Sequence, residues 1–144
     1  MALCLNTSAY ARLYIREEGH ELIWRTPKEV QQIAVHPIAY VEMRTALAKM
    51  LRMDHLTKRE VTVIKTIFES DWDKTLRIVP DERMMRRAAD LAEHYSLRGY
   101  NSVYLGTAES LIIGHRSDFL RFASFDHALN TAASAVCLNW LVAN

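Results

Sequence analysis

Four polar residues stand where predicted strands end or predicted helices begin. Asn6 follows a short apolar run at the start of the chain, and Asp126 follows the run of residues 119–124. Glu42 and Asn101 fall early in predicted helices. Carboxylate and amide oxygens suit hard cations such as Mg²⁺ or Mn²⁺, which activate water and offset the negative charge of a phosphodiester transition state. The four residues are therefore compatible with a metal-dependent site for phosphodiester hydrolysis.

Alternating strands and helices must position these side chains. The predicted strands span residues 2–5, 33–36, 76–79, 119–124 and 136–142. The predicted helices span residues 9–17, 40–53, 100–113 and 127–135, with others that begin near residue 26, at residue 57 and after residue 81. Strands separated by helices imply parallel pairing, right-handed crossovers and helices on both faces. Ligands of such sheets bind beyond the carboxyl ends of the strands, where Asn6 and Asp126 stand.

Capping signals and apolar stripes support the helices. Gly19 is predicted to stop the first one, and Thr57 with Glu60 forms a capping box for another. The stripe of that helix consists of Val61, Ile64, Ile67 and Phe68. Pro80 and Asp81 cap the next helix, whose stripe consists of Met84, Ala88, Leu91 and Tyr95. These patterns indicate amphipathic helices that pack on a core.

Four short blocks contain the candidate residues. They read ALCLNTSAY at 2–10, VEMRTAL at 41–47, LRGYNSVYLGTA at 97–108 and FASFDHAL at 122–129. In this order and spacing the chain resembles the PIN-domain nucleases, and most closely the VapC-type toxins of bacterial toxin–antitoxin pairs. The resemblance implies a single three-layer α/β/α PIN domain over residues 1–144, with a central, mostly parallel sheet of four to five strands.

The resemblance also implies a catalytic, metal-binding pocket. Asn6, Glu42, Asn101 and Asp126 match the four positions that line this pocket in the family, where Mg²⁺ or Mn²⁺ supports endonucleolytic cleavage of RNA. Glu42 and Asp126 fit the acidic pattern, whereas Asn6 and Asn101 stand where the family has Asp. Asn is nearly isosteric with Asp and its amide oxygen can bind a metal, but it carries no charge. We therefore expect weak metal binding and weakened or lost activity.

Supporting residues and partners follow from the same resemblance. Ser124 belongs to the expected catalytic group, and Thr7 and Ser8 match positions that support the pocket by hydrogen bonding. Similar proteins form homodimers and are inhibited by a small antitoxin that inserts a segment toward the pocket. Three accounts fit the two Asn: a naturally decayed nuclease, weak activity with one metal held by the two carboxylates, and deliberate inactivation.

Alternative roles exist for the same residues. Asn6 and Asp126 are good helix N-caps, and Glu42 alone would be an ordinary surface carboxylate. Glu109 lies two turns beyond Asn101 and is expected at the surface or the pocket rim. The rival function is a non-catalytic module that binds RNA or antitoxin. An unrelated phosphatase-like or receiver-like domain would place the four residues far apart.

Composition adds broad limits. The chain has 144 residues, half of them hydrophobic, with 18 basic and 17 acidic residues, so its net charge gives no argument for nucleic acid. Basic clusters at residues 58–59 and 83–87 are candidates for a local patch. Cys4 and Cys137 form no metal-ligand spacing, which favours buried free thiols. No secretory signal or membrane span is recognised, so we expect a soluble cytoplasmic protein.

Overall fold

Five parallel strands form the centre of the molecule, which is a computed structural model that describes residues 1–25, 30–113, 120–136 and 139–140. The strands are β1 (Ala2–Leu5), β2 (Gln32–Val35), β3 (Leu76–Arg77), β4 (Leu120–Ala123) and β5 (Asn139–Trp140). Their order is β3-β2-β1-β4-β5, and every pairing is parallel. In the register, Leu3 lies opposite both Ile33 and Arg121. The prediction of a mainly parallel five-stranded sheet is confirmed.

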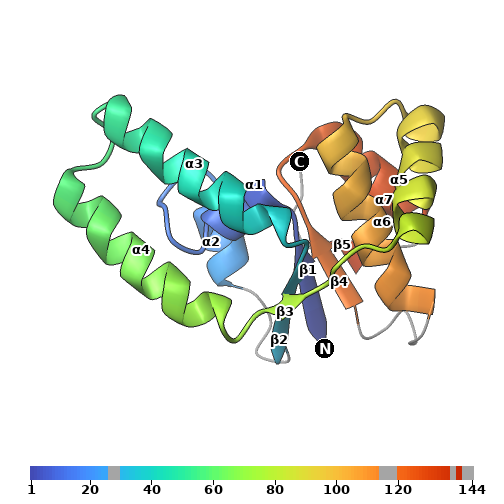
Figure 1. Ribbon diagram of the computed structural model, residues 1–144, viewed down its shortest axis with the longest axis horizontal. Helices are drawn as coiled ribbons and strands as arrows, with labels where there is room; N and C mark the ends of the chain where they lie inside the picture. The colour runs from blue at the N-terminus through green and yellow to red at the C-terminus, as the bar shows by residue number, and fades with distance from the viewer. Residues whose placement is uncertain (26–29, 114–119, 137–138, 141–144) are drawn as a thin grey trace.

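Seven helices cover the two faces of this sheet in the described chain (Figure 1). One side carries α1 (Thr7–Ala11), α2 (His20–Trp24), α3 (Ile38–Arg52) and α4 (Lys58–Trp72). The other side carries α5 (Glu82–Tyr95), α6 (Gly99–Ile113) and α7 (His127–Ala135). Helices α3 and α4 form a hairpin that extends away from the sheet (Figure 1). The expected α/β/α layering is therefore present. No helix among the described residues combines the length and apolar character that crossing a membrane requires.

The side chains of strand β1 pack against helices on both faces of the sheet. Successive side chains of a strand point to opposite faces. Leu3 and Leu5 accordingly join the apolar cluster beneath α1–α4, while Cys4 joins the cluster beneath α5–α7. All three side chains are at most 1 % exposed, as expected for a central strand covered on both faces. The carboxyl end of β1 is thus fixed from both sides.

The first predicted helix is wrong in extent. It was expected over residues 9–17, but α1 ends at Ala11 and the chain then turns, which brings Ile15 into the buried cluster. Gly19 does not stop that helix; it takes a left-handed conformation, with φ 84°, and caps α2, which was not predicted. The helix start predicted at residues 26–29 lies outside the described residues.

The remaining predictions differ mainly at element ends. The second strand begins and ends one residue earlier than predicted, the third pairs over only two residues, and α3 begins at Ile38 because Pro37 already has helical backbone angles. The cap and stripe of α5, the Thr57–Glu60 capping box and the bounds of α7 are confirmed. Ile67 is the exception on α4: it is 50 % exposed, because this flank of the hairpin lies away from the core.

Candidate functional site

The structure brings Asn6, Glu42, Asn101 and Asp126 to one small hollow beyond the carboxyl ends of β1 and β4. We call this hollow of about 250 Å³ the carboxylate pocket. Its other lining residues are Thr7, Ser8, Tyr100, Tyr104 and Phe125. A domain in which the four candidates lie far apart is therefore excluded. Two of the four are carboxylates, and no cluster of three or more His, Cys, Asp or Glu that could hold a metal occurs in the described chain.

Asn6 is buried and its amide has a fixed orientation. It is the N-cap of α1, and its Oδ1 accepts hydrogen bonds from the Ala9 backbone N–H at 3.0 Å and from the Ser8 hydroxyl at 2.8 Å. Both lone pairs of the amide oxygen are thereby occupied. The Nδ2 group is the only part of the amide left for other partners. Asn6 therefore meets the pocket as a hydrogen-bond donor.

Ser8 connects the ends of the two central strands. Its hydroxyl accepts a hydrogen bond from the Phe125 backbone N–H at 3.1 Å and donates one to Asn6. The Asn6 backbone N–H in turn donates to the carbonyl of Ala123 at 3.2 Å. The loops that carry Asn6 and Asp126 are thus joined by side-chain and backbone bonds. This matches the supporting role that the resemblance gave to Ser8.

Glu42 is held by two hydroxyl groups. The Thr7 hydroxyl and the Tyr104 hydroxyl both donate to its Oε2, and the two hydroxyls also contact each other. Burial raises the pKa of Tyr104 above its usual range, and the hydrogen bond to Glu42 adds to this effect. The tyrosine therefore remains a proton donor to Glu42. Only Oε1 of Glu42 is left for the pocket.

Asp126 is both a helix cap and a pocket residue. Its Oδ1 accepts the Leu129 backbone N–H at 2.9 Å at the start of α7, which confirms the predicted N-cap. Its own backbone N–H donates to the hydroxyl of the fully buried Ser124 at 2.9 Å. Ser124 therefore shapes the turn that presents Asp126, and it does not line the pocket. Oδ2 of Asp126 accepts no hydrogen bond from a described residue.

Asn101 differs from Asn6 because its side chain makes no hydrogen bond to any described residue. It is half-buried in the first turn of α6, next to the largely exposed Tyr100. Its amide can turn to present either the oxygen or the nitrogen. The two Asn of the pocket are therefore not equivalent.

Phe125 closes one wall of the pocket and is itself packed. The Arg12 guanidinium lies 3.7 Å from the centre of its ring, and Arg12 also donates to the Ser8 carbonyl at 2.7 Å. Gly19 packs against another part of the ring: a Cβ at this position would lie 2.3 Å from Cε1 of Phe125. The wall therefore depends on a residue that was expected only to end a helix.

Other candidates lie outside the pocket. Glu109 pairs with Arg87 through two hydrogen bonds of 2.7 Å, so it does not replace the missing charge. Arg86 of the same basic cluster pairs with Glu82 on the helix surface. Cys4 is a buried free thiol as expected, and burial raises its pKa to about 12. The position of Cys137 lies outside the described residues.

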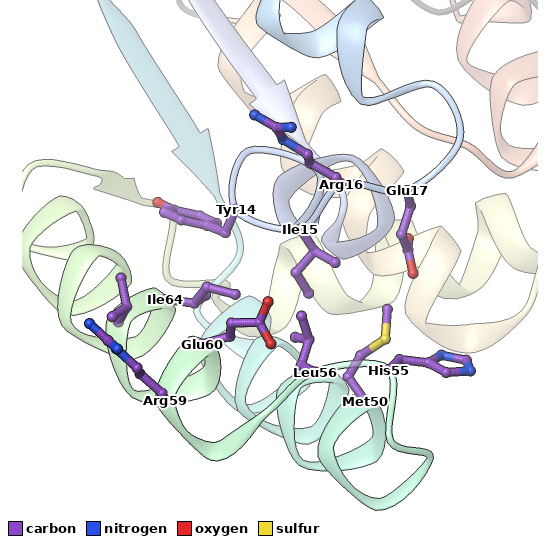
Figure 2. A pocket seen from close by; sticks show the side chains of 11 residues that line it. Tyr14, Ile15, Arg16, Glu17, Met50, His55, Leu56, Arg59, Glu60 and Ile64 are labelled. Atoms are coloured by element: carbon purple, nitrogen blue, oxygen red, sulfur yellow. The ribbon is translucent and has the colours of Figure 1, made fainter.

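Two larger hollows continue from the carboxylate pocket toward the helical hairpin. Figure 2 shows the hollow that lies farther from the carboxylate pocket. We call this hollow of about 650 Å³ the hairpin groove. Side chains from the turn after α1, the end of α3 and the start of α4 line it. A bridging hollow shares Thr7 and Ser8 with the pocket and Ile15 and Met50 with the groove. Neighbouring hollows therefore share lining residues along α1 and α3.

Comparisons with known proteins agree with this geometry. No family model matches the chain. Ribonuclease VapC45 from Mycobacterium tuberculosis CDC 1551 / Oshkosh and ribonuclease VapC49 from strain H37Rv are each 29 % identical to it over 130 residues, covering 90 % of this chain and 88 % of the relative. These relatives and the fold support a VapC-type PIN-domain family for the chain.

Solved structures share the fold of this chain. The crystal structure of FitAcB from Neisseria gonorrhoeae superposes with a TM-score of 0.64 at 14 % identity, over 97 % of this chain and 96 % of that one. The structure of FitAB bound to an IR36 DNA fragment gives a TM-score of 0.65 at 15 % identity, over 96 % and 92 %. At this identity the likeness concerns the fold.

Sequence reasoning missed three lining residues of the carboxylate pocket: Tyr100, Tyr104 and Phe125. Tyr100 and Tyr104 lie in the block around Asn101, one residue before it and three after it, and Phe125 directly precedes Asp126. The spacing of three was a usable indication, because residues i and i+3 share one face of a helix. The exposure of Tyr100 had no comparable indication in the sequence.

Proposed function

We propose that this chain is a VapC-like toxin whose carboxylate pocket acts on RNA with a divalent cation, at an activity reduced by Asn6 and Asn101. The observation that carries the proposal is the convergence of Asn6, Glu42, Asn101 and Asp126 in one polar hollow. The names of the related ribonucleases support RNA as the substrate. We also propose the cytoplasm as the location of this activity, since cellular RNA is present there.

The oxygen atoms of the pocket fit one hard cation. Glu42 Oε1, Asp126 Oδ2 and the Asn101 amide oxygen accept no hydrogen bond from a described residue, and such oxygens are the ligands of Mg²⁺ and Mn²⁺. Asn6 could join them only by turning its amide and losing both bonds at its Oδ1. We therefore assign the cation to Glu42, Asp126 and Asn101. When bound, it would lower the pKa of a water and offset charge on the phosphate.

The residues of the chain have separate roles in this proposal. Glu42, fixed through Oε2 by Thr7 and Tyr104, presents Oε1 in one direction. Asp126 is oriented by its cap to α7 and by Ser124. The Asn6 Nδ2 group donates a hydrogen bond to a phosphate oxygen of the substrate. Two carboxylates provide half of the formal charge that the family pattern has, which accounts for reduced activity.

We propose that a small antitoxin binds along the carboxylate pocket, the bridging hollow and the hairpin groove. The hairpin groove offers half-buried apolar side chains such as Met50, Leu56 and Ile64 (Figure 2), while the carboxylate pocket at the other end offers two carboxylates. A segment with apolar residues followed by an Arg or Lys matches both ends. Co-expression with the product of a short adjacent reading frame tests this partner. We expect capture by the parent chain and its loss in Val63→Asp, because Val63 lines the hairpin groove and is 52 % exposed.

We also propose a homodimer, on the resemblance to the family. The measurement is sedimentation equilibrium, which should give about twice the 16.6 kDa mass of the chain. A mass of 16.6 kDa, that of one chain, at every protein concentration would contradict the dimer.

Cleavage of a mixed RNA pool with Mn²⁺ or Mg²⁺ tests the activity. The parent chain is compared with Asn6→Asp/Asn101→Asp, and Asp126→Ala in that double variant is the control. We expect strong cleavage by the double variant, weak or no cleavage by the parent, and none by the control. Metal-dependent cleavage of equal rate by parent and double variant would contradict the proposed loss.

The second candidate function is binding of RNA without cleavage. The observation that favours it is the Asn6 amide, whose donor group replaces a ligand oxygen. RNA binding without cleavage by either the parent or the double variant would support this function.

A further inference from the structure

Tyr100 is an exposed aromatic residue at the rim of the carboxylate pocket. It exposes 61 % of its surface, although it lines the same hollow as Asn6, Glu42 and Asp126. It stands in the first turn of α6, directly before Asn101. Its hydroxyl forms no hydrogen bond with a described residue. Because the side chain is largely exposed, its ring is available for a ligand.

The size of the pocket limits what it can enclose. At about 250 Å³ it is smaller than the roughly 300–1,000 Å³ of hollows that enclose a complete small ligand. Its polar lining suits a phosphate and the adjoining sugar. The base of a bound nucleotide must then lie outside, at the rim.

Of the two exposed or half-exposed rings at this rim, Tyr100 is the uncovered one. Phe125 is already covered by the Arg12 guanidinium at 3.7 Å and packs against Gly19. A flat exposed ring beside a phosphate site is the arrangement on which single-stranded nucleic acids stack their bases.

We propose that Tyr100 stacks on the base next to the phosphate held in the carboxylate pocket and thereby favours unpaired RNA. This inference rests on the proposed function. A base inside a duplex is already stacked on both sides and cannot reach the ring, whereas an unpaired base can turn outward.

Binding of a short, non-cleavable 2′-O-methyl RNA in the presence of Mn²⁺ tests the proposal, because the cation of the proposed function is then present while the RNA stays intact. The probe is a single-stranded oligonucleotide with one 2-aminopurine, compared with its duplex. Variants are Tyr100→Ala and Tyr100→Phe, with Trp24→Ala as the control, because Trp24 is an aromatic residue 69 % exposed that does not line the pocket. We expect Tyr100→Ala to weaken binding roughly 5- to 20-fold and to restore 2-aminopurine fluorescence. Tyr100→Phe and Trp24→Ala should bind like the parent.

The outcomes separate this proposal from the proposed function. RNA binding by the parent that is unchanged in Tyr100→Ala, or equal affinity for single strand and duplex, would overturn the stacking role alone. Absence of RNA binding by both the parent and Asn6→Asp/Asn101→Asp would overturn the stacking role and the proposed function together.

Discussion

Tyr104 and Glu42 lie 62 positions apart in the chain, and the tyrosine hydroxyl donates a hydrogen bond to Oε2 of the glutamate. Helices α6 and α3 lie on opposite sides of the sheet, so this bond joins the two layers at the end of β1 (Figure 1). Tyr104 is only 2 % exposed. The bond therefore fixes a pocket carboxylate from the buried side.

Removing this hydroxyl should weaken cation binding. A hydrogen bond to a charged group contributes about 1.5–3 kcal/mol. Without the Tyr104 hydroxyl, Glu42 keeps only the hydrogen bond from Thr7, so its carboxylate is free to rotate. We expect Tyr104→Phe, in the Asn6→Asp/Asn101→Asp chain, to lower Mn²⁺ affinity roughly tenfold by calorimetry. The control is Tyr14→Phe, whose hydroxyl contacts Asp71 away from the pocket. An equal loss in both variants would show a general effect on packing instead.

The two Asn should differ in their contribution to stability. Asn6 caps α1 with a buried side chain, whereas Asn101 bonds to no described residue. We expect Asn6→Ala to lower the free energy of unfolding by about 1–2 kcal/mol and Asn101→Ala by less than about 0.5 kcal/mol. Urea unfolding measures both. Equal losses would mean that Asn101 has a structural role that its surroundings do not indicate.

Restoring Asp at position 6 should have the larger effect on the cation. Asn6→Asp replaces the Nδ2 donor with an oxygen and keeps the other oxygen on the cap, while Asn101 can already present an oxygen. A cation at a hundred times its Kd raises stability by about 2.7 kcal/mol. We expect Mn²⁺ to raise Tm most in the double variant, next in Asn6→Asp, then in Asn101→Asp and least in the parent. A larger shift for Asn101→Asp would contradict the fixed amide.

Gly19→Ala should destabilise the protein and disturb the pocket wall. Gly19 has φ 84°, and an added Cβ would meet Phe125 at 2.3 Å. We expect a loss of at least about 1–3 kcal/mol, the usual range for backbone strain alone. Gly99→Ala is the matched control, because nothing lies within 4 Å of a Cβ at this position. Thermal unfolding should leave that control unchanged or slightly stabilised.

His36 should make the free energy of unfolding depend on pH. Burial lowers the pKa of His36 below its ordinary value of 6.5, and its Nδ1 accepts the Ile38 backbone N–H at 3.0 Å. The unfolded chain therefore binds the proton more readily, so this contribution to stability is present above about pH 6.5 and is lost as the pH falls below it. His36→Asn keeps an acceptor but does not titrate. Urea unfolding at about pH 7.5 and about pH 5.5 should show a smaller loss in that variant.

Local patterns predicted the helices that have strong caps. The capping box at Thr57, the Asp81 cap and the apolar stripe of α5 specify their helices within a few residues. The region after Asn6 could not be predicted this way. There, tertiary packing of Ile15 ends α1 early, and the contact of Gly19 with Phe125 lies between residues far apart in the chain.

The sequence predicted the four polar residues that meet in the pocket, but it did not predict the hydrogen bonds that orient their side chains. The ends of β1 and β4 place Asn6 and Asp126 together by topology alone. Which oxygen each side chain has left depends on Ser8, Thr7 and Tyr104, and these contacts exist only once the layers are packed.

The cap at Asn6 separates folding from chemistry. Only Oδ1 of Asn6 accepts the backbone N–H that caps α1, and an Asp oxygen can accept the same hydrogen bond. Codons for Asp and Asn differ only in their first base, so one point mutation at this position exchanges a hydrogen-bond donor for an oxygen in the pocket while the cap of α1 persists. Selection for a stable fold would therefore treat the two residues alike.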